Sequence, residues 1–213
     1  MNIPYFRFQW LSTEKDEIIY VPVNPDEEEY VVYKEVKSRE AMGYLATKPT
    51  MIITTRHESG IVNAGVFGAY TNLSPTQVGV AVGCSCHTHA NILRDKKFVI
   101  NIPGADIVKT ISVLADNILE SISEIEEAGL TIKNGISTEI PSIAECQAAV
   151  EFVFDQELPI GSHSFMIGKV TGGWIRESAL DSDGKIDIFK ARVFKDFKYP
   201  APLYVLPGEV AQG

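Results

Sequence analysis

The 213-residue sequence is poor in cysteine. It has three, Cys84, Cys86 and Cys146. Small secreted domains held by disulfides need an even and much denser set, so this class of protein is excluded. An odd, low number of thiols fits the reducing cytosol. The N-terminal residues also show no basic region followed by an apolar stretch, which a secretory signal would have. We therefore expect a cytoplasmic protein without a secretory signal.

Long apolar runs and an excess of positive charge are also missing. No run approaches the roughly 20 apolar residues that a membrane-spanning helix needs. The formal net charge is −9, from 19 basic and 28 acidic residues. Because so acidic a surface repels phosphate backbones and anionic lipids, we expect neither a nucleic-acid nor a membrane partner. One small anionic ligand is still allowed, since a local group of backbone N–H groups can hold it.

Two nucleotide-binding motifs are absent as well. No Gly-Lys-Thr occurs in phosphate-loop spacing, and no Gly-x-Gly-x-x-Gly opens a predicted helix. These absences disfavour a P-loop enzyme and a Rossmann dinucleotide-binding domain. The hydrophobic share of 45% and the charged share of 22% are ordinary for a globular chain. The length suits a single domain, which we predict over residues 1–213.

Short β-rich segments dominate the chain from residue 49 onward. The predicted strands cover residues 30–33, 50–55, 61–67, 78–82, 98–102, 149–154 and 164–177. The predicted helices cover residues 40–45, 88–94, 106–119 (with Asp106 as N-cap) and 122–128. Closely spaced strands with few helices between them favour an antiparallel barrel over a parallel sheet. The fold class is therefore mainly β with helical decorations.

Small residues interrupt the predicted strand at 61–67 and the segment that follows it, Asn63–Tyr70. Glycine inside a strand marks either a bulge or a place where a ligand approaches the backbone closely. Taken alone, this segment favours the architectural bulge. The next residues, Asn72-Leu73-Ser74-Pro75, are interpreted as a polar turn that offers an amide and a hydroxyl.

The segment Cys84–Ile92 combines possible metal ligands with hydroxyl and amide groups. A metal site made of its two cysteines and two histidines is one interpretation, and a redox-active Cys84–Cys86 pair is another. We predict no metal site, because His87 and His89 at positions i and i+2 do not share a helical face. No second spaced ligand pair follows either. A receptor for a phosphate monoester fits better, since the first N–H groups of a helix are unpaired.

His163 begins a predicted strand after a turn that contains Gly161. A histidine in this position can form a hydrogen bond that holds the turn. It can equally contact a cofactor or substrate at the rim of a barrel. Both interpretations stay open.

The order of these segments resembles that of the flavin reductase-like (flavoredoxin) family. The matching motifs lie at residues 49–55, 60–75, 87–92, 98–103, 129–131, 141–146 and 161–170. The resemblance covers residues 45–175 and leaves residues 1–44 as an N-terminal extension. It implies a split β-barrel with Greek-key connections and a bound FMN. It also implies a homodimer in which each subunit helps to cover the flavin of the other.

The resemblance further implies which residues contact FMN. The isoalloxazine ring would lie along Asn63, Ala64, Gly65, Val66, Phe67 and Gly68. The ribityl chain and phosphate would be lined by Thr54, Thr55, Asn72 and Ser74, with Leu73 in the same segment. His87, Thr88 and Asn91 would hold the phosphate. Cys86 departs from the family pattern, which often has a basic residue at this place.

The function implied by the resemblance is an FMN-dependent oxidoreductase. It would pass electrons from NAD(P)H through FMN to an unidentified small-molecule or protein acceptor. No side chain is predicted to be catalytic, although His163 is a candidate contact at the rim. One alternative is an FMN-binding electron carrier or sensor without nicotinamide activity. Another is a barrel without FMN in which Cys84, Cys86, His87 and His89 act together.

Overall fold

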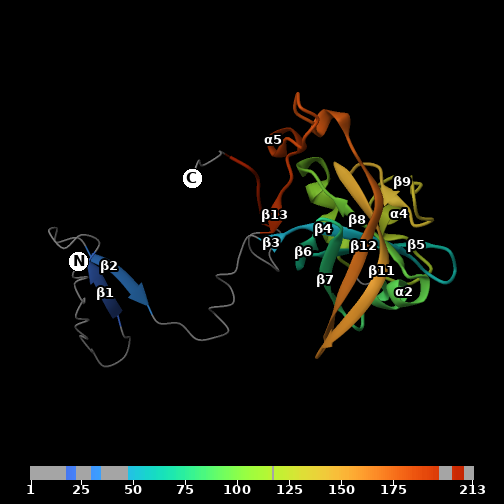
Figure 1. Cartoon of the computed structure of the whole chain (residues 1–213), viewed down its shortest axis with the longest axis horizontal. Coiled ribbons are helices and arrows are strands. Elements are labelled where there is room, and N and C mark those ends of the chain that lie inside the picture. Colours follow the sequence, from blue (N-terminus) through green and yellow to red (C-terminus); the bar gives the residue numbers. More distant parts are fainter. Residues whose placement is uncertain (1–17, 23–29, 35–47, 117, 197–202, 209–213) are drawn as a thin grey trace. The chain divides into compact units, whose positions relative to one another are not determined.

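The computed structural model describes residues 18–22, 30–34, 48–116, 118–196 and 203–208 (Figure 1). The chain divides into two units, residues 1–45 and residues 46–213. In the first unit, β1 (Ile18–Pro22) pairs with β2 (Tyr30–Lys34) in antiparallel fashion, which confirms the predicted strand at 30–33. The helix predicted over 40–45 lies outside the described residues. The single domain over 1–213 stays a prediction.

A curled antiparallel sheet of seven strands forms the second unit. Its strands are β4 (Met51–Arg56), β5 (Val62–Phe67), β6 (Tyr70–Ser74), β7 (Gln77–Gly83), β8 (Lys97–Ile102), β11 (Ala148–Ile160) and β12 (His163–Ile175). Their order is β5-β4-β8-β11-β12-β7-β6. Only Gly68 and Ala69 join the two edge strands β5 and β6, so the sheet must curl until its edges meet at this corner. The prediction of a mainly β split barrel is confirmed.

Short strands and helices surround the barrel. The short strands are β3 (Lys48–Pro49), β13 (Lys195–Asp196) and β14 (Tyr204–Val205) in one sheet, and β9 (Ile132–Lys133) with β10 (Ser142–Ile143) in another. The helices are α2 (His87–Asp95), α3 (Ile111–Leu114), α4 (Glu124–Glu127), α5 (Ile188–Ala191) and the 3-10 helices η2 (Ala105–Thr110) and η3 (Glu177–Ala179). Among the described residues, no helix combines the length and the apolar character needed to cross a membrane.

Two predicted elements differ from the structure. The helix over 106–119 is instead η2 followed by the single turn of α3, and its N-cap is Gly104 rather than Asp106. A Cβ at Gly104 would meet the Gln147 side chain at 2.5 Å, so tertiary packing rather than a capping side chain sets this start. The polar turn predicted at 72–75 also begins too early, because β6 continues to Ser74. Because the side chains of β6 are mostly exposed, the sequence of this edge strand resembles that of a turn.

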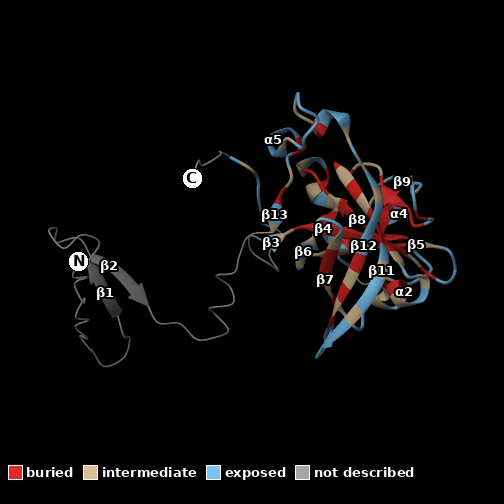
Figure 2. Cartoon of the chain, viewed as in Figure 1, coloured by how far each residue is buried: buried red, intermediate tan, exposed pale blue. Residues whose placement is uncertain are grey.

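Apolar side chains fill both faces of the central strands. Met51 and Ile53 on β4 pack inside the barrel with Phe98, whereas Ile52 packs on the outer face with Leu114 of α3. Successive side chains of a strand point to opposite faces, so β4 is buried on both sides. Figure 2 shows this buried centre in red, in contrast to the pale-blue far ends of β11 and β12. Core packing therefore fixes β4 from both faces of the sheet.

Candidate functional site

Four of the predicted FMN contacts form one buried hydrogen-bonded cluster. Thr55 on β4 lies opposite Asn63 on β5, and α2 adds Thr88 and Asn91. Asn63 Nδ2 donates to Thr55 Oγ1 at 3.0 Å and to Thr88 Oγ1 at 3.1 Å. Asn91 Nδ2 donates to Thr55 Oγ1 at 3.1 Å. Because both hydroxyl oxygens accept amide protons, their own O–H groups are left to donate to another acceptor.

The start of helix α2 lies directly beside this cluster. Cys86, the N-cap residue, has extended backbone and forms no hydrogen bond from its side chain to the helix start. The first N–H groups of a helix have no partner within the helix, and the helix dipole favours an anion there. Arg94, one helix length away, donates from Nη1 to Asn91 Oδ1 at 3.0 Å and from Nη2 to the Arg56 carbonyl. These bonds hold α2 against the end of β4.

Thr54 lies apart from the cluster. Its Oγ1 donates to the Pro141 carbonyl at 2.6 Å and accepts from Asn101 Nδ2 at 3.1 Å. Thr54 and Thr55 are neighbours on one strand and therefore point to opposite faces of the sheet. Through these two hydrogen bonds, Thr54 joins β4 to β8 and to the segment before β10.

On β5, the backbone N–H groups of alternate residues point away from β4, toward the free edge of the sheet. The N–H of Ala64 points away from β4 and donates to Glu124 Oε2 of α4 at 2.9 Å. Backbone groups alternate in direction along an antiparallel strand, so the N–H of Val66 points to the same outer edge. Burial raises the pKa of Glu124, which is 3% exposed. No motif in the sequence marks this carboxylate as part of the site.

Gly65 occupies a crowded place between β5 and α2. A Cβ built at Gly65 would lie 2.9 Å from the ring of Phe67 and 3.2 Å from Thr88 Oγ1. The glycine therefore lets β5 approach the start of α2 closely. Gly68 is less crowded, with Pro49 O at 3.4 Å as its nearest neighbour.

The remaining predicted contacts lie away from the buried cluster. Asn72 and Leu73 are exposed on β6, and Ser74 Oγ accepts the N–H of Thr76 at 3.2 Å in the following turn. His163 is exposed at the start of β12, opposite Gly83 of β7. Its Nδ1 lies 3.0 Å from Ser162 Oγ, which is the turn-holding contact considered from the sequence. Within the described residues, no hydrogen bond joins these side chains to the cluster.

The cysteines and histidines of residues 84–89 do not converge. His87 Nε2 lies 3.6 Å from Glu120 Oε1, whereas His89 Nε2 lies 2.8 Å from Glu157 Oε1. The prediction that the two histidines point in different directions is confirmed. Cys84 and Cys86 are free and exposed.

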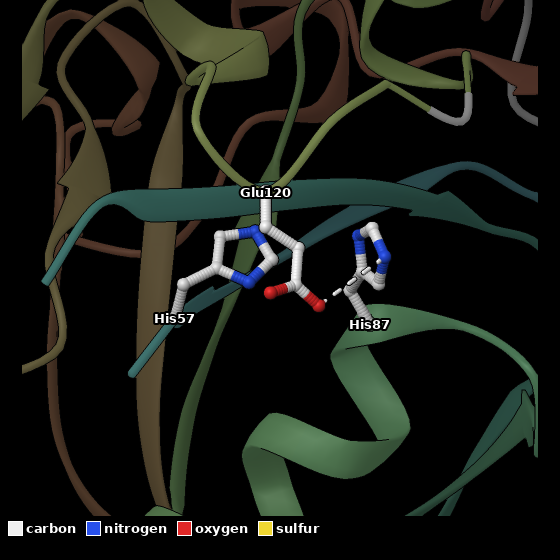
Figure 3. Close-up of side chains that lie close together, drawn as sticks. All are labelled: His57, His87 and Glu120. Carbon is white, nitrogen blue, oxygen red and sulfur yellow. Dashed lines mark ion pairs between the residues drawn. The ribbon is translucent and has the colours of Figure 1, made fainter. Parts of the chain in front are cut away.

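His57 and Glu120 join His87 in a group that sequence reasoning missed. The rings of His57 and His87 have centroids 5.1 Å apart and meet edge to face, and Figure 3 shows both beside the Glu120 carboxylate. Burial lowers the pKa of His57, and the neighbouring His87 ring lowers it further. The lowered pKa favours the neutral form of the ring. The three residues are about 30 positions apart in the sequence, so no local motif could have revealed them.

Two surface hollows lie elsewhere on the second unit. One, of about 440 Å³, is lined by residues 60–62, 121–123, 126, 127 and 132. The other, of about 470 Å³, is lined by parts of residues 105–112 and 194–206. Neither hollow includes a predicted FMN contact. The predicted contacts at residues 65–68 instead lie on the barrel wall, where these residues are half-buried.

Comparison with known proteins places the sequence among flavin-linked proteins. A family model described as "Flavin reductase like domain" matches residues 42–201. An uncharacterized protein of Archaeoglobus fulgidus is 29% identical over 151 residues, which cover 68% of this chain and 81% of that protein.

Solved structures share the fold. A structure with a split barrel domain from Shewanella frigidimarina superposes with a TM-score of 0.73 at 18% identity, covering 83% of this chain and 92% of that one. The flavoredoxin of Desulfovibrio vulgaris (Miyazaki F) has a TM-score of 0.71 and is 21% identical, and the match covers 78% of this chain and 90% of the flavoredoxin chain. An FMN-binding protein from Thermus thermophilus has a TM-score of 0.69 and is 20% identical, and the match covers 85% of this chain and 98% of that chain.

Proposed function

The chain belongs to the flavin reductase-like family, and on that premise we propose that it is an FMN-dependent oxidoreductase. It takes electrons from NAD(P)H and passes them to a small-molecule or protein acceptor in the cytoplasm. When bound, the flavin supplies the redox chemistry, and the protein supplies placement, hydrogen bonds and control of access. The similar fold of an FMN-binding protein and of a flavoredoxin supports the choice of cofactor.

The observation that carries the proposal is the buried cluster of Thr55, Asn63, Thr88 and Asn91 at the start of α2. Its amide groups orient the two hydroxyls so that their O–H groups can donate to a phosphate monoester. The N–H groups at the start of α2 add further donors, and the helix dipole adds favourable charge. Arg94 Nη1 donates to Asn91 Oδ1 at 3.0 Å and so helps to hold Asn91 in place. The residues present therefore fit one phosphate group, as in FMN.

The outer edge of β5 is the proposed place for the ring. The N–H of Val66 points outward there, and Gly65 lacks the side chain that would hold a flat ligand away from the backbone. At residues 65–68 this edge is half-buried and lines neither surface hollow, although Val62 at the start of β5 lines the smaller one. A flavin bound there needs a second surface to shield it, which supports a homodimer as the working form.

Replacement of Thr88 by valine tests the proposal. The purified protein is supplied with FMN or with riboflavin, which lacks the phosphate, and binding is followed by quenching of flavin fluorescence. We expect Thr88→Val to weaken FMN binding about tenfold or more, because a hydrogen bond to a charged group contributes about 1.5–3 kcal/mol. Riboflavin binding should change little, and Thr88→Ser, which keeps the hydroxyl, should behave like the unaltered protein. Equal losses for both ligands would refute the phosphate assignment.

A carrier or sensor that binds FMN without nicotinamide activity is the second candidate, favoured by the lack of a nicotinamide-binding motif in the sequence. Anaerobic addition of NADH or NADPH to the flavin-loaded protein separates the two. Bleaching of the flavin absorption supports the oxidoreductase. Flavin that stays oxidised with both nucleotides supports the carrier.

A further inference from the structure

We propose that His57, His87 and Glu120 form a binding site for a divalent first-row transition-metal ion such as Zn²⁺. Two imidazoles and one carboxylate are a common ligand set for these ions, and three protein ligands leave one coordination position open. The site is distinct from the cluster of Thr55, Asn63, Thr88 and Asn91 but adjoins it at His87, which the family resemblance also assigned to the FMN phosphate.

Three separate elements bring the ligands together. His57 lies in the turn between β4 and β5, where its N–H donates to the Ile61 carbonyl at 2.8 Å and its carbonyl accepts from Gly60 at 2.9 Å. His87 is the first residue of α2. Glu120 belongs to the turn between α3 and α4. The turn and the helix start fix both histidines before any ion binds, which lowers the cost of assembling the site.

The distances suit a small cation. The potential ligand atoms of the three side chains all lie within 4.8 Å of one another, and the His87 and Glu120 atoms are 3.6 Å apart. Ligand atoms around a tetrahedral zinc ion stand about 3.4 Å apart, given bonds of about 2.0–2.1 Å. Only small adjustments are therefore needed. The exposed Glu120 side chain can make them, because 67% of its surface is free.

His57 provides an independent indication that a ligand belongs here. The residue is 3% exposed, and its Nε2 atom is buried without a hydrogen-bond partner among the described residues. A buried polar nitrogen in this state is costly, and native proteins rarely keep one without a reason. Figure 3 shows the His57 ring directed toward the Glu120 carboxylate, with the His87 ring on the other side. A cation between these groups would satisfy the ring and the carboxylate together.

The surrounding charges also permit a cation. Arg94 is a positive group that acts on His57, and its Nε donates to Asp95 Oδ1 at 2.7 Å. Because Arg94 is paired with its own carboxylate, its repulsion of an incoming cation is reduced.

Titration of the chelator-treated, full-length protein with Zn²⁺ and Co²⁺ tests the site. Calorimetry gives the Zn²⁺ stoichiometry and affinity, and the visible spectrum of the Co²⁺ form reports the ligand types. Glu120→Gln is the main variant, because its exposed side chain can be changed without disturbing the fold. His57→Gln is the second, with circular dichroism to verify folding. The matched control is His89→Ala, since His89 contacts Glu157 instead.

We expect one ion per chain, with binding weakened at least about tenfold by Glu120→Gln and by His57→Gln and unchanged by His89→Ala. The Co²⁺ spectrum should lack thiolate charge-transfer bands and should be the same in Cys84→Ser/Cys86→Ser. Loss of binding in that double variant, or binding insensitive to both Glu120→Gln and His57→Gln, would overturn the proposal. So would absence of stoichiometric binding to the unaltered protein. Thr88→Val keeps all three ligands, so it should retain the ion even where it loses FMN.

Discussion

The carboxylate of Glu124 accepts the backbone N–H of Ala64 at 2.9 Å and thereby joins helix α4 to the edge strand β5. An edge strand exposes backbone groups along its free side, and here a buried side chain satisfies one of them. The bond also orients the strand whose next outward N–H, that of Val66, is proposed to face the flavin. In the proposed complex, the position of the ring thus depends on the hydrogen bond between Glu124 and Ala64.

Glu124→Gln should change how stability depends on pH. Burial raises the pKa of Glu124, so the folded state favours the neutral carboxyl and its ionisation opposes folding. The stabilising contribution is full below the ordinary glutamate pKa of about 4.3 and is lost as the pH rises through the higher folded value. Relative to Glu124→Gln, the unaltered protein should therefore lose stability from about pH 4 upward. Urea unfolding at several pH values measures this, and parallel curves for the two proteins would contradict it.

Glu151→Gln should destabilise the protein at neutral pH. Glu151 is fully buried and accepts the N–H groups of Ile136 at 2.6 Å, Ser137 at 2.8 Å and Thr138 at 2.6 Å. Loss of the charge and of one acceptor should cost about 1–3 kcal/mol in the free energy of unfolding. Asp155→Asn is the control, because Asp155 pairs at the surface with Lys169, whose side chain is 57% exposed, and such a pair should contribute about 0–1 kcal/mol.

The same carboxylate should make the protein sensitive to acid. Burial raises the pKa of Glu151, but the backbone donors outweigh this effect and the net pKa lies below its ordinary value. A lowered pKa means that stability is present above the unfolded value of about 4.3 and is lost as the pH falls through the folded value. Glu151→Gln should therefore show a flatter loss of stability below pH 4. An equally steep loss in both proteins would assign the acid sensitivity to other groups.

Gly65→Ala should affect FMN binding. The new methyl group would lie 2.9 Å from the Phe67 ring and 3.2 Å from Thr88 Oγ1. It must therefore displace the ring or the hydroxyl, and we expect FMN affinity to fall about tenfold, or roughly 1.4 kcal/mol. Flavin fluorescence titration measures the loss. Gly208→Ala, at a position with no atom within 4 Å, is the matched control and should bind as before.

The sequence predicted much of the barrel and the helix at residues 88–94, which is α2 in the structure, but not the boundaries of the helical segment from residue 105 to residue 114. Strands β4 and β8 were evident because their continuous apolar runs are buried on both faces. The apolar spacing over residues 107–114 was correct, since Ile107, Ile111 and Leu114 are buried. The helix boundary was wrong, because contacts with distant segments decide where such a helix starts and ends. Local patterns carry no information about those contacts.

The candidate site was predictable only in part for the same reason. Thr55, Asn63, Thr88 and Asn91 came from the order of motifs in the family, and the structure brings these four together. His57, Glu120 and Glu124 come from turns and short helices without a motif of their own. Their grouping arises when the barrel folds and the segment between α3 and α4 packs near the start of α2. A single sequence, read residue by residue, does not contain that proximity.

The two-residue corner between β5 and β6 imposes a constraint on how this barrel can vary. Gly68 and Ala69 join the opposite edges of one sheet, so neither edge can shift its register without moving the other. An insertion at this corner would separate the edges and displace the backbone that is proposed to face the ring. The turn that contains Glu120 carries no such constraint. Divergence of ligand preference among relatives is therefore expected to concentrate in that turn, while the corner keeps its length.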